Sequence, residues 1–402
     1  MLNSAVTALL GFVFWILAAR LYTAEAVGLA SAALSAVSLL SGIAAVGLGM
    51  GLVRYSPDAG GDAKKLINSV FTTNVILAII IAAVFIIGLD IWSPGLIFIR
   101  EQPLYLLLFI IFTVATGLTG MAQYSFIARK RSDFALIQSC IFMISKIILV
   151  VLLAQIFAAF GIFSAVGIGY MIAVSLGIFI LLPRIVKGYF PLPGIRINLL
   201  KGIIKFSSFN YVADIIATAP ALVLSIMIVN MLGPEQTAYF FITWSIAGLL
   251  YAIGSSTSLS IFAEGSNNGQ ITPGHMWQSL KFILILLIPA IILMILLGDK
   301  LLLIFGKEYS EEGTRLLMML TLTALPLSIN SIYFSKKKVE KDMKPVILFS
   351  GLIAALTLGL SYLLLPQFGL IAAGAAWLAS QAITAMIILV IFIRNRTLKR
   401  NI

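Results

Sequence analysis

The stretch AARLYTAEAVGLA at residues 18–30 places an arginine and a glutamate in a chain that is 61% hydrophobic. A similar stretch, VNMLGPEQTAYF, occupies residues 229–240, and its glutamate stands 210 residues after Glu25. Each stretch ends one long apolar run and begins another. Carboxylates and hydroxyl caps stabilise the first turn of a helix, and proline is tolerated there. We therefore expect Thr23 to cap the helix that follows it and Pro234 to lie in the first turn of the equivalent helix in the second stretch.

The composition indicates an integral membrane protein. With 402 residues, only 10% of them charged, and a mean hydropathy of +1.11, the chain has more apolar surface than a soluble core could bury. Apolar runs long enough to cross a hydrocarbon core of about 30 Å recur throughout, and strands do not give such runs. We predict an all-α fold with twelve transmembrane helices. The expected spans are 4–21, 26–53, 66–90, 104–128, 134–158, 162–183, 206–231, 236–263, 276–298, 314–335, 345–365 and 369–393.

The basic residues predict the orientation. Connections on the side of both termini, with the tail, hold 20 Lys and Arg residues, and the opposite side holds 5. Because cytoplasmic loops carry the excess, we expect a multi-pass protein of the cytoplasmic membrane with both termini in the cytoplasm. Basic loops such as ARKR (128–131) and SKKKVEKDMK (335–344) suit contact with anionic membrane lipid, which explains the net charge of +12 without a nucleic-acid partner.

An internal repeat organises the chain. A shift of 209 residues aligns 124–133 with 333–342, and a shift of 208 places Gly161 on Gly369. Six helices have therefore been duplicated in the same orientation. In this alignment Met1 falls on Tyr211, well inside a helix, so we expect either an unusually short start or a start further upstream. The predicted parts are an N-terminal six-helix lobe (1–185), a cytoplasmic linker with a short amphipathic helix (186–205), and a C-terminal six-helix lobe with a basic tail (206–402).

Several chemistries find no support in the sequence. The single cysteine, Cys140, excludes a disulfide framework, and the single histidine, His275, excludes a centre with several histidine ligands. Phosphate-loop, zinc-protease and hydrolase signatures are absent. The glycine-rich GLGMG at 47–51 lies in a predicted membrane helix, where close helix packing is its expected use. We expect no enzyme activity, catalytic residue, metal site or cofactor, apart from a coupling Na⁺ or H⁺.

Polar groups inside a membrane span are costly and mark candidate sites. On the seventh predicted helix Ser207, Asn210, Asp214 and Thr218 share one face. We predict that Asp214, with Asn210, binds a coupling proton or cation. Gln381, on a polar face of the twelfth helix, is a further candidate for this role. Hydroxyl groups can also bond back to their own helix, so the Ser and Thr stripes are open to a packing role.

A second group of residues suits an anionic ligand. Lys146 and Gln138 lie on the fifth predicted helix and Gln123 on the fourth, whereas Arg20 and Arg54 lie at helix ends. We predict that all five bind substrate, and that Lys146 faces a cavity or an ion pair instead of reaching out to the membrane surface. Interfacial anchoring is the alternative for the two arginines.

The two halves differ in charge. In the second half the residues nearest the positions of the three cations of the first half are Asn230, Glu264 and Ala354 or Ala355. We therefore expect the anionic group of a ligand to be held by the first lobe.

The chain resembles the Wzx-like polysaccharide flippases of the multidrug/oligosaccharidyl-lipid/polysaccharide superfamily over nearly its whole length. The stretches that carry the resemblance are FWILAARLYTAEAVGLASAALS (14–35), GLVRYSP (51–57) and LLLIFGKEYSEEGTRLLMMLTLTALP (301–326). The resemblance implies a MATE-like fold of two six-helix lobes around a central cavity that opens to either side in turn. It also implies that an oligosaccharide on a polyprenyl phosphate or pyrophosphate is translocated, with Arg20 and Arg54 holding the phosphate and Asp214 serving cation coupling.

Two alternative functions remain open. A MATE-type drug exporter of the same superfamily would concentrate acids for cationic substrates, yet the cations in the spans outnumber the acids. A membrane glycan polymerase or ligase would need a large external loop or a catalytic cluster, and no outer connection exceeds roughly fifteen residues. We expect a monomer that works with glycosyltransferase or polymerase machinery.

Overall fold

The computed structural model describes residues 2–57, 62–154, 159–268 and 273–400. Within these ranges the chain is helical and contains no strand. Eleven helices are long and apolar enough to cross a membrane, and the first helix contributes a shorter apolar stretch, Val6–Leu21. The prediction of an all-α, multi-pass membrane protein is confirmed, and these eleven spans and the shorter stretch lie at the positions of the twelve predicted spans.

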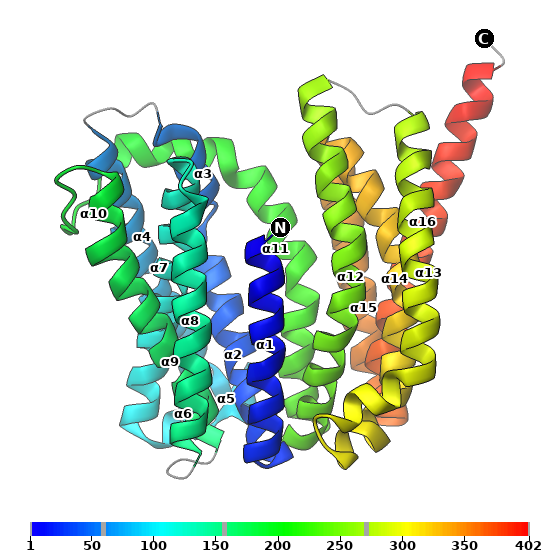
Figure 1. Ribbon diagram of the computed structural model, residues 1–402, viewed down its shortest axis with the longest axis horizontal. Helices are drawn as coiled ribbons and strands as arrows, with labels where there is room; N and C mark the ends of the chain where they lie inside the picture. Colours follow the sequence, from blue (N-terminus) through cyan, green and yellow to red (C-terminus); the bar gives the residue numbers. More distant parts are fainter. Residues whose placement is uncertain (1, 58–61, 155–158, 269–272, 401–402) are drawn as a thin grey trace. The chain divides into compact units, whose positions relative to one another are not determined.

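The chain divides into two compact units. Unit 1 comprises Met1–Ile215 and Ser225–Ala238, and unit 2 comprises Ile216–Leu224 and Tyr239–Ile402. The helices that begin in unit 1 are α1 (Leu2–Leu21), α2 (Ala24–Ala45), α3 (Leu48–Tyr55), α4 (Ala63–Ile87), α5 (Leu89–Trp92), α6 (Phe98–Glu101), α7 (Pro103–Ala128), α8 (Ser132–Leu153), α9 (Ala159–Leu176), α10 (Leu182–Ile185), α11 (Ile197–Met231) and α12 (Pro234–Asn268). Those wholly in unit 2 are α13 (Pro273–Leu303), α14 (Lys307–Val339), α15 (Met343–Phe368) and α16 (Ile371–Arg400), as Figure 1 shows.

The two quoted stretches form equivalent helix starts. Thr23 caps α2, and its hydroxyl oxygen accepts a hydrogen bond from the Ala26 N–H at 3.2 Å. The start of α12 at Pro234 lies 210 residues after the start of α2, and Gly233 before it has a φ of +93°. Both expectations for these turns are confirmed, because capping and proline placement depend on the local sequence alone.

A second pair of turns corrects the register of the repeat. Lys130 and Lys341 both have a φ of +57°. The Arg131 N–H donates to the Phe126 carbonyl at 2.9 Å. The same bond recurs 211 residues further on, where the Asp342 N–H donates to the Lys337 carbonyl at 3.0 Å. The offset here is therefore 211, not 209. The pairing of Gly161 with Gly369 is also wrong, because Gly161 lies inside α9 whereas Gly369 precedes α16.

The corrected register changes the counterpart of Lys146 from Ala354 or Ala355 to Thr357. A Cβ atom built on Gly169 would lie 3.4 Å from the Cβ atom of Lys146, so the lysine packs against α9 at this glycine. At the positions 211 residues further on, the hydroxyls of Thr357 and Ser380 form a hydrogen bond of 2.7 Å. One half of the repeat thus holds a satisfied hydroxyl pair where the other holds an ammonium.

The linker differs from its prediction. Residues 189–196 are non-helical, and α11 then runs without interruption from Ile197 to Met231. The short, separate amphipathic helix expected within 186–205 is absent from the described chain, because Lys201 and Lys205 belong to the first turns of this long helix and Arg196 precedes it. The side chains of Lys205 and Glu264 lie outside the described residues.

The GLGMG stretch interrupts a helix. Val46 and Gly47 have φ values of +43° and +70°, and they separate α2 from α3. The Tyr211 hydroxyl lies beside the carbonyl groups that this break leaves exposed, and it donates to the Ile43 carbonyl oxygen at 2.6 Å. A side chain at Gly47 would come within 2.8 Å of the Cβ atom of Ser207. Close helix packing is confirmed here, but at a break and not within a continuous helix.

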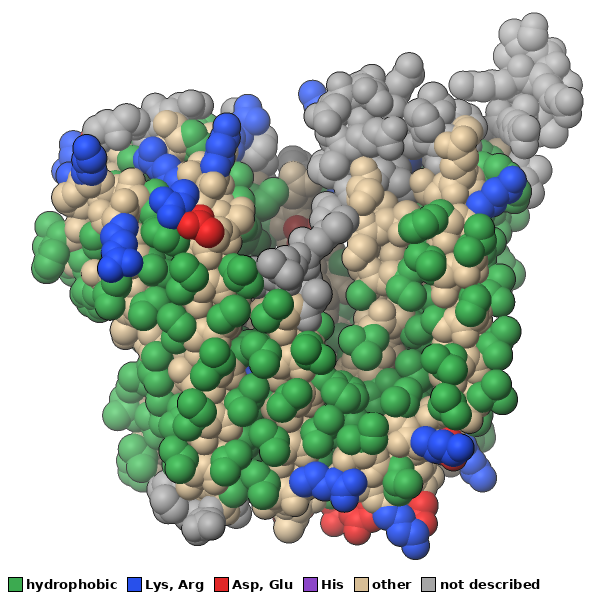
Figure 2. Space-filling view, in the orientation of Figure 1, with side chains coloured by type: hydrophobic (Ala, Val, Ile, Leu, Met, Phe, Trp, Pro, Cys, Tyr) green, Lys and Arg blue, Asp and Glu red, His purple; other side chains and the backbone are tan. Residues whose placement is uncertain are grey.

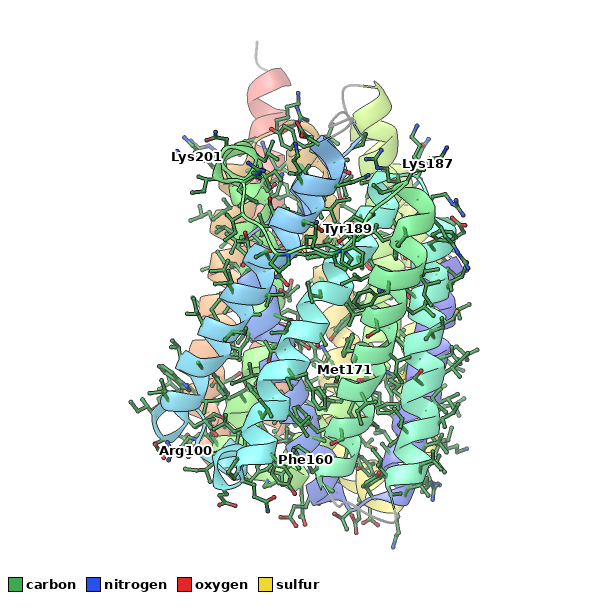
Figure 3. All side chains as sticks on the ribbon, turned by 90° about the vertical axis from the view of Figure 1, so that its left-hand side faces the viewer. Arg100, Phe160, Met171, Lys187, Tyr189 and Lys201 are labelled. Atoms are coloured by element: carbon green, nitrogen blue, oxygen red, sulfur yellow. The ribbon has the colours of Figure 1, made fainter. Side chains whose placement is uncertain are left out.

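Basic side chains gather at one end of unit 1, over α4, α8 and α10, and an apolar belt covers the helices next to them (Figure 2). We call this the basic end, and it includes the turns at 129–131 and 184–187. Figure 3 shows Lys187 and Lys201 at this end and Arg100 at the other.

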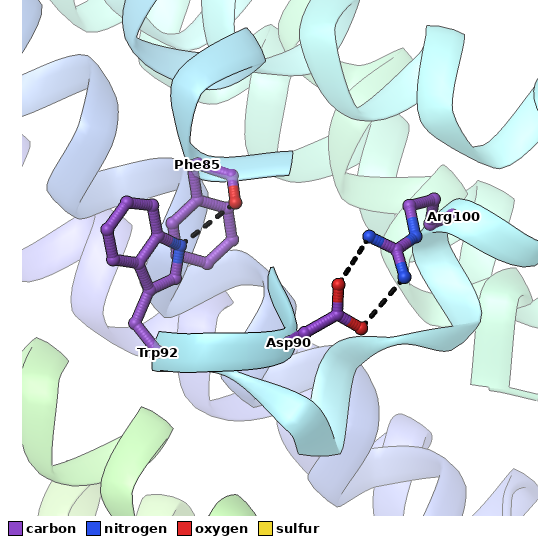
Figure 4. A network of polar contacts seen from close by, with 4 residues as sticks. All are labelled: Phe85, Asp90, Trp92 and Arg100. Carbon is purple, nitrogen blue, oxygen red and sulfur yellow. Dashed lines mark hydrogen bonds and ion pairs between the residues drawn. The ribbon is translucent and has the colours of Figure 1, made fainter. Parts of the chain in front are cut away.

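The opposite end of unit 1 is held by a polar bracket. Arg100 forms two hydrogen bonds with the Asp90 carboxylate at 2.7 and 2.8 Å, and the Trp92 indole N–H donates to the Phe85 carbonyl at 2.9 Å (Figure 4). Asn230 completes the bracket: its side chain accepts from the Gly95 N–H and donates to the Trp92 carbonyl, both at 3.0 Å. These contacts order residues 88–102, which contain only short helices.

The Asp90 pair predicts a small pH effect. The hydrogen bonds from Arg100 lower the pKa of the Asp90 carboxyl below its ordinary value. A lowered folded-state pKa stabilises the fold above the unfolded pKa of about 4, and this contribution is lost as the pH falls through the folded value. We expect Asp90→Asn to melt slightly below the wild type at pH 7, because the pair is exposed. Thermal unfolding at decreasing pH measures the difference in melting temperature between the wild type and Asp90→Asn, which should narrow below about pH 4. A difference in melting temperature that stays constant with pH would contradict this account.

Candidate polar cavity in unit 1

A cavity of about 350 Å³ lies between four helices of unit 1. This volume is near the lower end of the roughly 300–1,000 Å³ that small-molecule sites occupy. None of the residues that line it is acidic or basic. The lining residues are Thr7 of α1, Thr116, Thr119, Gly120 and Gln123 of α7, Ser139, Phe142 and Met143 of α8, and Tyr170 of α9.

The polar part of the lining is suited to hydrogen bonding. Gln123 donates its side-chain N–H to the Ser139 hydroxyl at 3.2 Å, and this bond joins α7 to α8. Thr116 and Thr119 donate to carbonyl groups of their own helix at 2.8 and 2.7 Å. Their hydroxyl oxygens retain acceptor capacity, since each hydroxyl has two lone pairs. The cavity therefore offers amide and hydroxyl groups of the kind that bind sugar hydroxyls.

Aromatic rings form another wall. Phe142 and Tyr170 both line the cavity and stack with ring centroids 4.1 Å apart. Flat apolar faces beside hydrogen-bonding groups are complementary to sugar rings, which have apolar faces and polar edges. The sequence did not single out these two aromatic residues, because 26 phenylalanines and 12 tyrosines are spread along the chain. Phe142 lies four residues before Lys146, so helical spacing could have indicated that it shares a face with the lysine.

Lys146 lies beside this cavity. Its side chain is buried, with 6% exposed, and its Nζ atom lies 4.4 Å from the ring centroid of Phe14 and 5.0 Å from that of Phe142. In the described part of the chain Lys146 forms no ion pair. Burying an ammonium group costs several kcal/mol. A cation–π contact from which water is excluded recovers about 2 kcal/mol of this cost. The structure thus places an uncompensated positive charge next to a polar cavity.

Gln138 lies close in sequence but does not line the cavity. Its side chain is fully buried and donates to the Ala173 carbonyl at 3.1 Å, four residues before the π-helical segment Gly177–Leu181. A side chain at Gly177 would clash with the Gln138 amide. The structure therefore places Gln138 in the packing between α8 and α9, while Gln123 faces the cavity.

The two arginines lie far from each other. Arg20 is exposed in the last turn of α1, and Arg54 is exposed near the end of α3. The chain between them runs along α2 and α3, which at 1.5 Å per residue separates their levels by roughly 40 Å. The structure does not bring them together, and neither lines the cavity.

Asp214 and Asn210 lie on α11. Asp214 is exposed and Asn210 is partly buried. Tyr124 of α7 is close enough to Asp214 for an electrostatic interaction. Tyr211, on the same stretch of α11, donates to the carbonyl groups at the break between α2 and α3. A carboxylate is thus located on the helix that contacts this break.

Gln381 lies in unit 2. It is buried, and both its backbone carbonyl and its side-chain carbonyl accept hydrogen bonds from the Asn330 side chain, at 3.1 and 2.7 Å. The bond connects α16 to α14. The roles predicted for Gln381, Asp214 and Asn210 in cation coupling remain predictions.

Comparison with known proteins adds a family match. The family model described as "Polysaccharide biosynthesis protein" matches residues 1–240. No curated protein matches the chain.

Solved structures share the fold. A structure described as "Lipid II flippase MurJ, inward closed conformation" has a TM-score of 0.79 and 16% identity, and covers 96% of this chain and 85% of its own. An inward-facing "multidrug resistance MATE family transporter of the MOP superfamily" has a TM-score of 0.75 and 14% identity, with 98% and 96% covered. A MOP superfamily transporter from Pyrococcus furiosus, whose description cites a "reverse polarity of binding pocket", has a TM-score of 0.61 and 13% identity, with 96% and 91% covered. These likenesses confirm the expected MATE-like fold.

Proposed function

Because the chain belongs to the family of polysaccharide biosynthesis proteins, we propose that it is a flippase that translocates a lipid-linked oligosaccharide across the cytoplasmic membrane. The carrier is a polyprenyl phosphate or pyrophosphate, and both termini face the cytoplasm, as the excess of basic residues at the basic end favours. The fold shared with transporters supports an alternating-access cycle in place of bond-forming chemistry.

The observation that carries the proposal is Lys146 beside the cavity in unit 1. An anionic group of the substrate would compensate the buried ammonium, and the hydroxyl and amide groups of the lining would bind sugar hydroxyls. The corrected register strengthens this argument. Unit 2 has Thr357 bonded to Ser380 at the equivalent place, so the repeat folds without a cation there.

Cationic drugs fit this cavity poorly. No residue of its lining is acidic, and Lys146, which contacts the lining residue Phe142, is positive. A site for cationic substrates would place carboxylates there, so the cavity favours the glycan substrate over the drug substrate.

The test is translocation in proteoliposomes. The purified protein is reconstituted with a fluorescent lipid-linked oligosaccharide, and access by an external lectin is followed with and without a proton or sodium gradient. Protein-dependent exposure supports the proposal. Absence of exposure with several lipid-linked glycans, in vesicles that accumulate a cationic dye, contradicts it and favours a drug exporter.

Substitution of Asp214 tests the coupling. Asp214 is the only acidic residue between Asp133 and Glu235. We expect Asp214→Asn to abolish the acceleration by the gradient, because the amide does not bind a proton and binds a cation weakly. Lectin access should then proceed at the rate seen without a gradient. A variant that keeps the full gradient response would show that coupling lies elsewhere.

A further inference from the structure

The segment between α10 and α11 is held against α4 as an extended strap. We define the strap as residues 189–196, which contain Pro191 and Pro193 and form no helix. Proline lacks the N–H that a helix needs and favours extended backbone before it. Figure 3 shows this segment crossing unit 1 between Lys187 and Lys201.

Three hydrogen bonds fasten the strap to α4. The Asn68 side chain donates to the Phe190 carbonyl at 3.0 Å. The Gly194 N–H donates to the Thr72 hydroxyl at 3.1 Å, and the next bond runs from the Arg196 N–H to the Ser69 hydroxyl at 3.1 Å. The strap is therefore a fixed part of unit 1.

The strap presents an apolar surface beside its attachment to α4. Elements that lie in a membrane interface bury an apolar face about 5–10 Å into the boundary between headgroups and acyl chains. The strap and the first turn after it expose four large apolar side chains: Phe190 (64%), Leu192 (59%), Ile195 (48%) and Ile197 (61%). These side chains are suited to contact with acyl chains.

A cavity of about 430 Å³ opens where the strap meets α11. Lys65 and Arg196 line it together with Asp62, and Asn198 adds an amide. Lys65 donates to the Asp62 carboxylate at 2.8 Å, and both side chains are more than half exposed. The hydrogen bond and charge of Lys65, followed by the charge of Arg196, lower the pKa of Asp62. The two cations therefore act on the same small volume.

One carboxylate cannot neutralise two cations, and further basic residues lie at the same end of unit 1. The Lys64 Nζ atom lies 3.0 Å from the position of a Cβ atom built on Gly188, and Lys187 and Lys201 belong to the same end. A ligand that satisfies this surface has a phosphate group for the cations and hydrocarbon for the exposed apolar side chains.

We propose that the cavity between α4 and the strap is a binding site for the phosphate headgroup of an anionic phospholipid, with Lys65 and Arg196 as its cationic ligands and the strap as its acyl-chain contact. The site is independent of the translocated substrate. It fixes the linker between the two six-helix halves to the membrane surface on which that linker lies.

Native mass spectrometry of the purified protein tests the site. The full chain is incubated with phosphatidylglycerol or with phosphatidylcholine of the same acyl chains. We expect preferential retention of phosphatidylglycerol, lowered on the order of tenfold by the double variant K65Q/R196Q, because each cation near an anionic headgroup contributes measurably. Asp62→Asn should raise retention several-fold, since it releases Lys65 from a competing carboxylate.

The control removes the same charge from the side of the chain that carries few basic residues. K300Q/R315Q changes one exposed lysine of α13 and one exposed arginine of α14, neither of which lines the cavity, and should leave retention unchanged. Equal losses in this control, equal retention of phosphatidylcholine, or complete displacement by inorganic phosphate would each overturn the proposal. Displacement by a lipid-linked sugar but not by phosphatidylglycerol would assign the cavity to the substrate and overturn it too.

Discussion

Replacing Lys146 with methionine is expected to slow translocation by roughly 10- to 100-fold while raising the melting temperature. The slower rate follows from losing a charge-assisted contact with the substrate anion, worth about 1.5–3 kcal/mol. The higher melting temperature follows because an unpaired buried ammonium destabilises the fold, and methionine has a similar volume without the charge. Translocation in proteoliposomes and thermal unfolding in detergent measure the two effects.

The direction of the stability change separates two roles for Lys146. If its contacts with Phe14 and Phe142 serve to hold α1 against α8, removal of the charge lowers the melting temperature. If the charge is kept for a ligand, the melting temperature rises and activity falls, because such sites are maintained at the expense of stability. Lys146→Arg should restore only part of the activity, since guanidinium is planar and larger than ammonium.

Lys281 provides a matched control. It lies in α13 of unit 2, it is exposed, and its Nζ atom lies 5.5 Å from the Trp277 ring centroid. Lys281→Met also removes one cation that contacts an aromatic ring within a membrane helix. Unlike Lys146, however, the Lys281 ammonium group is already solvated or at the membrane surface. We expect neither translocation nor the melting temperature to change much. Equal losses of activity in both lysine variants would contradict the assignment of Lys146.

The sequence predicted local features well because local chemistry decides them. Thr23 and Pro234 are placed by the requirements of a helix start, which involve only neighbouring residues. The linker was predicted less well, although the signal was present: Pro191 and Pro193 favour extended backbone, and this outweighs the helical spacing of the basic residues. The predicted register of the repeat near these turns differs from the observed one by two residues. Lys130 and Lys341 share the same backbone conformation, and identical residues near a turn do not reveal that conformation.

The cavity could be predicted only in part. The cost of burying charge singled out Lys146, and the same reasoning singled out Gln123 and Gln138. It could not separate the last two, because a glutamine that bonds a neighbouring helix carbonyl and one that lines a cavity look alike in sequence. Phe14 and Tyr170 were not predicted, since pairing between helices determines which of many aromatic residues meet.

The second large effect is expected at Gly28. A Cβ atom built on this residue of α2 would overlap the carbonyl oxygen of Pro234, in the first turn of α12. Backbone cannot yield as a flexible side chain does, so the two helix starts would have to separate. We expect Gly28→Ala to cost at least about 3 kcal/mol of stability and to remove most of the folded protein. Size-exclusion chromatography and thermal unfolding of the solubilised variant measure this loss.

Gly11→Ala is the matched control. No atom lies within 4 Å of a Cβ atom built on Gly11, which is also helical. Alanine has the better helix propensity, by about 1 kcal/mol in water, so this variant should fold as well as the wild type or better. If Gly28→Ala melts like Gly11→Ala, the close contact of α2 with α12 does not exist in the folded protein. If only Gly28→Ala fails, the turn that opens α2 and the turn that opens α12 are joined by backbone contact, and the quoted stretches stabilise unit 1 together.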